Sequence, residues 1–227
     1  VLLTANILNA LLEGFCMVNA SLFPYDKIRP EQDELVKDVY AAVSGGKCLI
    51  AHAPTGLGKT AAALAPALEY AMTSKKTVFF LTSRHTQHLM AVETAKLIKQ
   101  RFRVNFSVTD IVGKKHMCAR DDVSNLYSNQ FYEYCRSLTE TDGCEFFLNF
   151  RKGSMLTSES KVVIARIAAE PMHSEEVVAA SKRCKVCPYE VAVAASKDAA
   201  LVIADYNYLF SPKVRDGFLR RSGKSLE

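Results

Sequence analysis

Apolar positions along this chain follow two patterns, short unbroken runs and longer stretches at helical spacing. The unbroken runs predict buried strands over residues 47–52, 77–81, 106–112 and 200–204. The longer stretches predict helices over residues 30–43, 60–72 and 86–101. Strands that alternate with helices are typical of a parallel sheet covered by helices. The pattern therefore predicts an α/β fold.

The strongest local motif joins the first predicted strand to the helix that follows it, and reads Ala53-Pro54-Thr55-Gly56-Leu57-Gly58-Lys59-Thr60. A strand, a glycine loop, Gly-Lys-Thr and a helix are the context of a phosphate-binding loop. The glycines allow backbone N–H groups to turn toward phosphates, and the helix N-terminus adds its dipole. Lys59 is expected to neutralise the outer phosphates, and the Thr60 hydroxyl to bind Mg²⁺. The general motif begins with glycine, where this chain has Ala53.

Two residues ahead of this loop are candidates for binding a nucleotide base. The amide of Gln32 can pair with the edge of adenine, which favours ATP over GTP, and Tyr25 can stack on the base. An exposed helix glutamine without such a role remains the alternative for Gln32.

Positive charge is concentrated in one segment. The net charge is +5, and residues 75–120 alone carry ten Lys and Arg against two Asp and Glu. Within this segment Arg84 follows a predicted strand, and residues at the carboxyl ends of such strands face the ligand crevice. A basic segment inside a folded domain indicates a polyanionic partner. A solvated basic face without a partner remains the alternative.

Composition indicates a folded chain with reduced thiols. The chain is 49% apolar and 23% charged, which excludes wholesale disorder, and seven cysteines are odd in number and too few for a disulfide scaffold. Cys48 lies in an apolar run and is expected to be a small buried residue. Five cysteines cluster later in the chain: Cys118, Cys135, Cys144, Cys184 and Cys187. Four thiolates can hold an iron–sulfur cluster or a zinc ion, and the spacing leaves both open, together with unrelated thiols.

Six motifs in order resemble the XPD-type DNA helicases of superfamily 2, which include the DinG-type enzymes, with the archaeal members nearest: FPYDKIRPEQ, APTGLGKT, FFLTSRHTQH, VGKKHMC, CPYE and ADYNYLFSP. The resemblance implies a RecA-like P-loop parallel sheet with an inserted, mainly helical domain that holds a 4Fe–4S cluster. It implies ATP-driven 5′-to-3′ movement on single-stranded DNA with Mg²⁺, unwinding at forks, and a role in DNA repair. The form of the phosphate loop that begins with alanine also fits helicases.

The resemblance assigns roles to residues of this chain. Gln32 reads adenine, and Gly56, Gly58, Lys59 and Thr60 hold the phosphates. The cluster ligands are Cys118, Cys135, Cys144 and Cys187, and Cys184 is the spare, although the spacing leaves open an exchange of Cys184 for Cys187. Contact with DNA is expected from Arg84, His85, Lys114, Lys115 and Tyr208, and for Tyr208 a core or hinge position remains the alternative. Asp205 is not the Mg²⁺ aspartate, because the family's acidic box follows this segment.

The resemblance also predicts the domain organisation. Residues 1–21 form an extension of uncertain status, residues 22–112 the first part of motor domain 1, residues 113–190 the iron–sulfur domain, and residues 191–227 the return to motor domain 1. Because the acidic box and a second motor domain are expected beyond residue 227, this chain alone is expected to bind nucleotide without turnover. Its expected partners are single-stranded DNA and the remaining helicase domains of the same polypeptide.

Two other function classes remain open at this stage. One is a different P-loop phosphoryl-transfer enzyme, and the other is a metal-dependent nucleic-acid-binding module without ATPase activity. The apolar residues near the N-terminus are interrupted by Asn6, Asn9, Glu13 and Asn19, so no membrane span is expected. A cytoplasmic location is the expectation.

Overall fold

The computed structural model describes residues 22–226. The predicted N-terminal extension, residues 1–21, lies outside them. The chain divides into two compact units between Tyr70 and Ala71. This division differs from the predicted boundaries at residues 112 and 190, which remain a prediction.

The first unit is built on two helices, α2 (Pro30–Ser44) and α3 (Lys59–Ser74), as the sequence predicts, and α3 continues into the second unit. Pro30 occupies the first turn of α2, where its missing N–H costs no hydrogen bond, and the acidic Glu31 and Asp33 suit the helix N-terminus. Gly45 follows the last turn and donates its N–H to the carbonyl of Ala41 at 3.0 Å.

The predicted strand at residues 47–52 is wrong for this structure. The segment has no regular secondary structure, Cys48 is exposed, and the side chain of Ile50 is 99% exposed. A strand needs a neighbour that accepts and donates ladder hydrogen bonds, and the described part of the first unit contains no other strand. The expectation that Cys48 is a small buried residue fails for the same reason.

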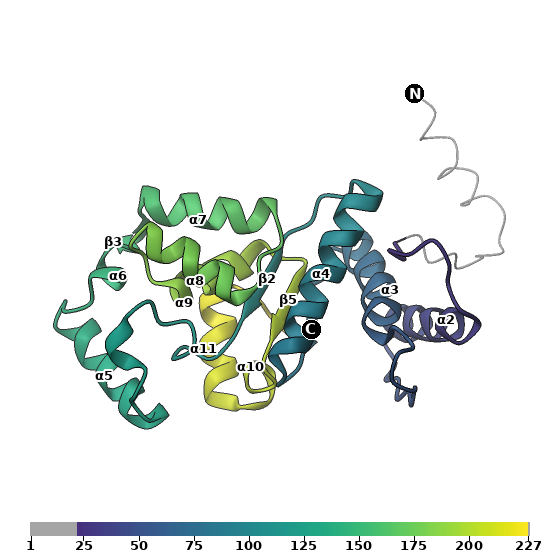
Figure 1. Cartoon of the computed structure of the whole chain (residues 1–227), viewed down its shortest axis with the longest axis horizontal. Helices are drawn as coiled ribbons and strands as arrows, with labels where there is room; N and C mark the ends of the chain where they lie inside the picture. Colours follow the sequence, from purple (N-terminus) through teal and green to yellow (C-terminus); the bar gives the residue numbers. More distant parts are fainter. Residues whose placement is uncertain (1–21, 227) are drawn as a thin grey trace. The chain divides into compact units, whose positions relative to one another are not determined.

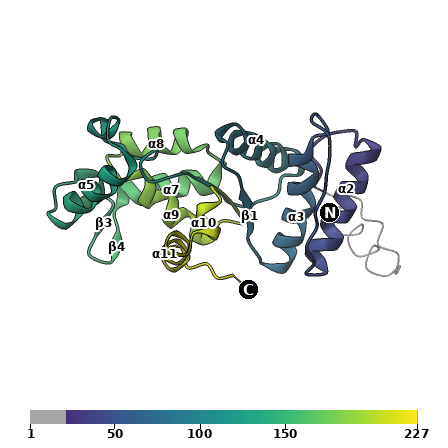
Figure 2. The same ribbon diagram turned by 90° about the horizontal axis from the view of Figure 1, so that it is seen from below.

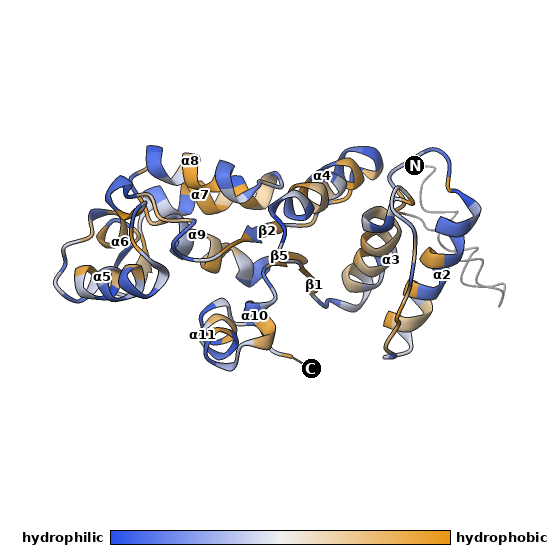
Figure 3. Ribbon diagram, turned by 60° about the horizontal axis from the view of Figure 1, so that its bottom comes forward, coloured by the Kyte–Doolittle hydropathy of each residue, from blue (hydrophilic) through white to orange (hydrophobic). Residues whose placement is uncertain are grey.

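The second unit is organised around a parallel sheet of β1 (Val78–Leu81), β5 (Leu201–Ala204) and β2 (Val108–Ile111), with β5 in the centre. Leu201 is in register with both Val78 and Val108. Every residue of β2 and β5 is buried, as expected for a parallel sheet covered on both faces. Figure 3 shows the hydrophobic colour along β1 and β5. The predicted parallel α/β sheet is confirmed.

The remaining elements of the second unit are mostly helices, which Figure 1 shows in chain order. They are α4 (His85–Phe102), the 3-10 helix η1 (Asp121–Val123), α5 (Ser128–Glu140), α6 (Glu145–Leu148), the antiparallel pair β3 (Arg151–Lys152) and β4 (Met155–Leu156), α7 (Ser158–Ala169), α8 (Ser174–Arg183), α9 (Pro188–Ala195), the 3-10 helix η2 (Ser196–Asp198), α10 (Asn207–Phe210) and α11 (Pro212–Ser222).

One apolar core joins the sheet to the later helices. Ile111 and Val202 of the sheet belong to the same buried cluster as Ile167 of α7, Val177 of α8 and Val191 of α9. Helices α5 and α6 lie farther from the sheet than α7 to α9 in both ribbon views (Figures 1 and 2). The second half of residues 113–190 therefore contributes to the same core as the sheet. Among residues 22–226, no helix combines the length and the apolar composition that a bilayer crossing requires.

Candidate functional site

The phosphate loop at the start of α3 has the backbone that the motif requires. Gly56 and Gly58 have φ angles of +83° and +79°, a conformation that other residues rarely adopt. Lys59 is the first residue of α3, and its ammonium donates to the carbonyls of Ala53 at 3.0 Å and Pro54 at 2.7 Å. The lysine therefore lies over the loop. The first N–H groups of a helix have no intrahelical partner, so the start of α3 can bind an anion.

Gln32 braces this loop. Its side chain is 6% exposed, its amide nitrogen donates to the carbonyl of Leu57, and its amide oxygen accepts from the N–H of Arg29 at 3.0 Å. The Arg29 guanidinium also donates to the carbonyl of Gly56 at 3.0 Å. Because both the nitrogen and the oxygen of the Gln32 amide form hydrogen bonds within the protein, neither is free to pair with a base in this arrangement. Sequence reasoning missed the bracing role, because the contact joins Gln32 to Leu57, 25 residues further along the chain.

Tyr25 is accessible for base stacking. Its ring is half exposed and meets Phe23 edge to face, with ring centroids 5.8 Å apart. Phe23 is buried, so of these two rings only that of Tyr25 is accessible to a nucleotide base. The predicted role of Tyr25 stays a prediction.

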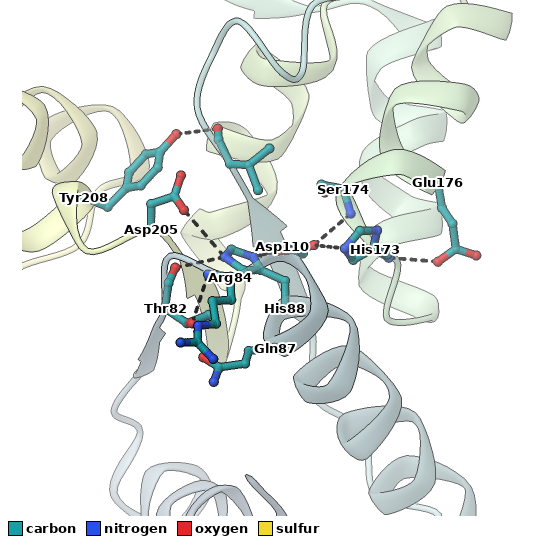
Figure 4. Close-up of polar contacts among 11 residues, drawn as sticks. Thr82, Arg84, Gln87, His88, Asp110, His173, Ser174, Glu176, Asp205 and Tyr208 are labelled. Atoms are coloured by element: carbon teal, nitrogen blue, oxygen red, sulfur yellow. Dashed lines mark hydrogen bonds and ion pairs between the residues drawn. The ribbon is translucent and has the colours of Figure 1, made fainter.

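In the second unit, polar residues gather at the carboxyl edge of the sheet (Figure 4). Arg84 precedes α4 and is exposed, as is His85, and the N–H of Arg84 donates to the hydroxyl of Thr82 at 3.3 Å. Asp205 follows β5 at the same edge. Arg84 and His85 are therefore placed where the prediction needs them, on the surface of this edge.

The side chains of the other three predicted DNA contacts are engaged within the protein. Tyr208 is 3% exposed and donates its hydroxyl to the carbonyl of Val112 at 2.9 Å, so its ring is not open to a base. Lys115 donates to the carbonyl of Leu126, and Lys114 lines the pocket described next. Sequence reasoning missed that the exposed aromatic residues here are instead Tyr206, just before α10, and Phe210, its last residue, which are 50% and 74% exposed.

One pocket collects the predicted cluster ligands. Its lining includes the cysteines Cys118, Cys135, Cys144 and Cys187. They come from the segment before η1, from α5, and from the residues just before α6 and α9. Cys184 does not line the pocket and packs against the apolar core. The structure therefore separates the four predicted ligands from the predicted spare.

Burial makes these thiols poor candidates for isolated anions. It raises the pKa of Cys187 to about 12 and raises that of Cys118. Burial alone lowers the pKa of Lys114, but the neighbouring Cys135 and Glu190 outweigh it and raise that pKa. A positive group thus remains beside the thiols. Deprotonated thiols at this place need a metal centre or an equivalent cation to compensate them.

The four cysteine side chains of the pocket do not meet at a single point. Within residues 22–226, no three His, Cys, Asp or Glu side chains lie close enough together to hold one metal ion. The cysteines surround a space instead, whose other walls include Phe131, Phe147 and Tyr189. Four thiols beside apolar walls are a donor set that an iron–sulfur cluster or a zinc ion can use.

A buried histidine that the motif analysis gave no role lies beneath Arg84. His88 contacts Asp110 of β2, with its Nδ1 2.5 Å from the carboxylate Oδ1 (Figure 4). Neither side chain is exposed to solvent. A histidine four residues after Arg84 carries no signal by itself, since its partner is far away along the chain.

Comparisons with known proteins agree with this geometry. The family model DEAD_2 matches residues 80–224. The chain is 26% identical over 141 residues to the regulator of telomere elongation helicase 1 homolog of Caenorhabditis briggsae, covering 61% of this chain and 13% of that protein. It is 26% identical over 222 residues to the general transcription and DNA repair factor IIH helicase subunit XPD of Arabidopsis thaliana, covering 88% of this chain and 28% of that protein.

A solved structure of truncated XPD has a similar fold. It superimposes with a TM-score of 0.53 and 18% sequence identity, covering 86% of this chain and 48% of that chain. The chain thus spans 13% to 28% of the length of the two curated helicases named above.

Proposed function

The chain belongs to the DEAD_2 family, and on that premise we propose that it forms the ATP-binding and strand-binding part of a DNA helicase. The observation that carries the proposal is the phosphate loop, in which two glycines with positive φ lead into Lys59 and Thr60 at the start of α3. In helicase motors such a loop holds the β- and γ-phosphates and Mg²⁺. Lys59 supplies the charge, and Thr60 the hydroxyl.

Strand binding is assigned to the carboxyl edge of the sheet in the second unit. Exposed Arg84 and His85 supply donors for phosphates, and the segment after β5 supplies the exposed rings of Tyr206, just before α10, and Phe210, at the end of α10. Basic groups beside aromatic faces are the usual combination for binding single strands without sequence preference. Movement in the 5′-to-3′ direction, unwinding at forks and a role in DNA repair belong to the same proposal.

A 4Fe–4S cluster completes the proposal, held by Cys118, Cys135, Cys144 and Cys187. The group supplies a rigid inorganic cross-link between distant parts of the chain. The residues around it position it: Lys114 offsets negative charge, and the aromatic walls keep out water. The expected role is mechanical, as part of the surface that a duplex meets.

Purification without oxygen tests the metal part of the proposal. The expected product is brown, with about four irons and matching sulfide per chain. Colourless protein with one zinc would instead indicate a mononuclear site. The variants Cys187→Ser and Cys184→Ser form a matched pair, because only the first removes a side chain that lines the pocket. Iron is expected to fall in the first variant and not in the second.

Binding assays test the nucleotide and strand parts. The wild-type chain is expected to bind a fluorescent ATP analogue with Mg²⁺ and a labelled oligo-dT, the latter with an affinity that falls as salt rises. Lys59→Ala is expected to weaken analogue binding at least tenfold and leave the oligo-dT affinity and its salt dependence unchanged. Tight oligo-dT binding without nucleotide binding would point to a nucleic-acid-binding module. Phosphoryl transfer to a small acceptor without DNA would point to another class of P-loop enzyme.

A further inference from the structure

A buried histidine ties together the carboxyl ends of all three strands of the sheet. His88 lies in the first turn of α4, and its ring sits between Asp110 of β2, Thr82 after β1 and Asp205 after β5 (Figure 4). Its Nδ1 is 2.5 Å from the Asp110 carboxylate. Its Nε2 is 3.2 Å from the carbonyl oxygen of Thr82 and 3.8 Å from the Asp205 carboxylate.

These partners favour a ring that carries both protons. The Thr82 carbonyl oxygen only accepts hydrogen bonds, so Nε2 of His88 donates to it, and Nδ1 faces the Asp110 carboxylate. The imidazolium form donates at both nitrogens. Burial lowers its pKa, but Asp110 and Asp205 outweigh burial and raise it to about 10. The geometry and the charge balance agree.

Asp110 extends the network to another helix. Its second carboxylate oxygen accepts the N–H of Ser174 at the start of α8, at 2.8 Å, and lies 3.5 Å from Nε2 of His173. One buried carboxylate thus fixes the starts of both α4 and α8. Buried ion pairs often add little net stability compared with apolar residues, while a specific geometry is what they can enforce.

The element that this network fixes is the loop that carries Arg84. The Thr82 carbonyl is held by the imidazolium, and the Thr82 hydroxyl accepts the N–H of Arg84 at 3.3 Å and bonds to Gln87. The carbonyl and the hydroxyl of Thr82 therefore both form hydrogen bonds. As a result, the backbone that carries the Arg84 side chain is held in place. An arginine that must meet a phosphate loses less entropy when its backbone is already ordered.

We propose that His88 and Asp110 are positioning residues, which hold the Thr82–Arg84 loop in the conformation that binds a nucleic-acid strand. This inference rests on the proposed strand-binding function of the carboxyl edge. Neither residue touches the strand, and both act through Arg84.

The variants Asp110→Asn and His88→Gln test this idea in the complete chain. Asp110→Asn keeps the side-chain volume and an acceptor for Ser174, so it serves even if His88→Gln does not fold. Oligo-dT affinity is measured by fluorescence anisotropy well below the unfolding midpoint, with folding checked by circular dichroism. We expect roughly tenfold weaker binding for each variant, and a salt dependence reduced by about one phosphate contact, as for Arg84→Ala.

A double-mutant cycle separates positioning from a general effect on stability. If His88 and Asp110 act through Arg84, adding Asp110→Asn to Arg84→Ala has no further effect on affinity. Ser160→Ala is the stability control, because it removes the buried hydrogen bond that the Ser160 hydroxyl, in α7, donates to the Phe150 carbonyl. Its oligo-dT affinity is expected to stay at the wild-type value.

The outcomes distinguish this inference from the function on which it rests. Wild-type affinity in folded Asp110→Asn, or additive losses in the cycle, would overturn the positioning role while the strand-binding function stands. A wild-type chain that binds no oligo-dT would overturn the strand-binding function and the inference together.

Discussion

At the scale of single residues, the phosphate loop depends on one close contact. A Cβ at position 58 would collide with the amide of Gln32, and the φ of +79° is itself strained for any other residue. The sequence identifies Gly58 as part of a phosphate motif, but it does not reveal that Gln32 occupies the space beside it. That contact depends on the approach of α2 to the loop, which no local pattern encodes.

The substitution Gly58→Ala is therefore expected to distort the loop. Backbone strain of this kind costs about 1–3 kcal/mol, so affinity for a fluorescent ATP analogue should fall roughly tenfold or more. Gly46→Ala is the matched control, because Gly46 also has a positive φ, of +63°, but has open space around it. The control should lose stability without losing nucleotide affinity. Equal affinities in wild type and Gly58→Ala would contradict the bracing arrangement.

Tyr208 and Tyr206 offer a contrast between a structural and a binding tyrosine. Tyr208→Phe removes the buried hydrogen bond to the Val112 carbonyl, and is expected to lower the free energy of unfolding by about 0.5–1.5 kcal/mol without changing oligo-dT affinity. Tyr206→Ala removes an exposed ring and is expected to weaken oligo-dT binding by about 1–3 kcal/mol with little effect on stability. Urea unfolding and anisotropy check both. The reverse result would restore Tyr208 as the base-stacking residue.

At the scale of elements, the apolar pattern succeeds where burial alone decides the structure. The three strands of the sheet and the helices α2, α3 and α4 lie where the sequence predicts them, within a few residues. The run at residues 47–52 has the same apolar character but forms no strand. Periodicity reports which side chains avoid water, whereas a strand also requires a neighbour in the ladder. That neighbour is a property of tertiary structure.

The stability of the chain is expected to depend on pH through His88, which lies where α4, β2 and the end of β5 meet. The facing groups are Asp110 on β2, Asp205 after β5 and His85 on the same helix. The pKa of His88 is raised from 6.5 to about 10, so the folded state holds a proton that the unfolded state releases. The stability that this proton contributes is fully present below pH 6.5 and is lost as the pH rises toward 10.

Urea unfolding between pH 6.5 and pH 9.5 measures this effect. The free energy of unfolding of the wild-type chain should fall over that range. In His88→Gln the fall should be smaller, since the variant has no imidazolium to lose. Parallel curves for the two proteins would show that His88 does not hold a proton in the folded state.

At the scale of the whole molecule, the positions of the cysteines in the structure can be compared with what their spacing in the sequence predicts. The resemblance to a family selects the four cysteines that line the pocket, and Cys184 is left outside. Spacing did not predict how the segment divides. Helices α7 to α9 share the core of the sheet, whereas α5 buries only Phe131 and α6 buries no residue in the described part of the chain.

The proposed cluster, combined with this division, predicts a local response to its loss. Helices α5 and α6 have little apolar burial of their own, so a cluster held by Cys118, Cys135, Cys144 and Cys187 would supply much of their order. Oxidative removal of iron is expected to increase hydrogen exchange over residues 118–150 and to leave β1, β2 and β5 protected. Cys187→Ser should reproduce the pattern without oxidation, and Cys184→Ser should not. Exchange that spreads evenly through the sheet would mean that the cluster supports the whole second unit, and unchanged exchange would mean that the four thiols hold no centre.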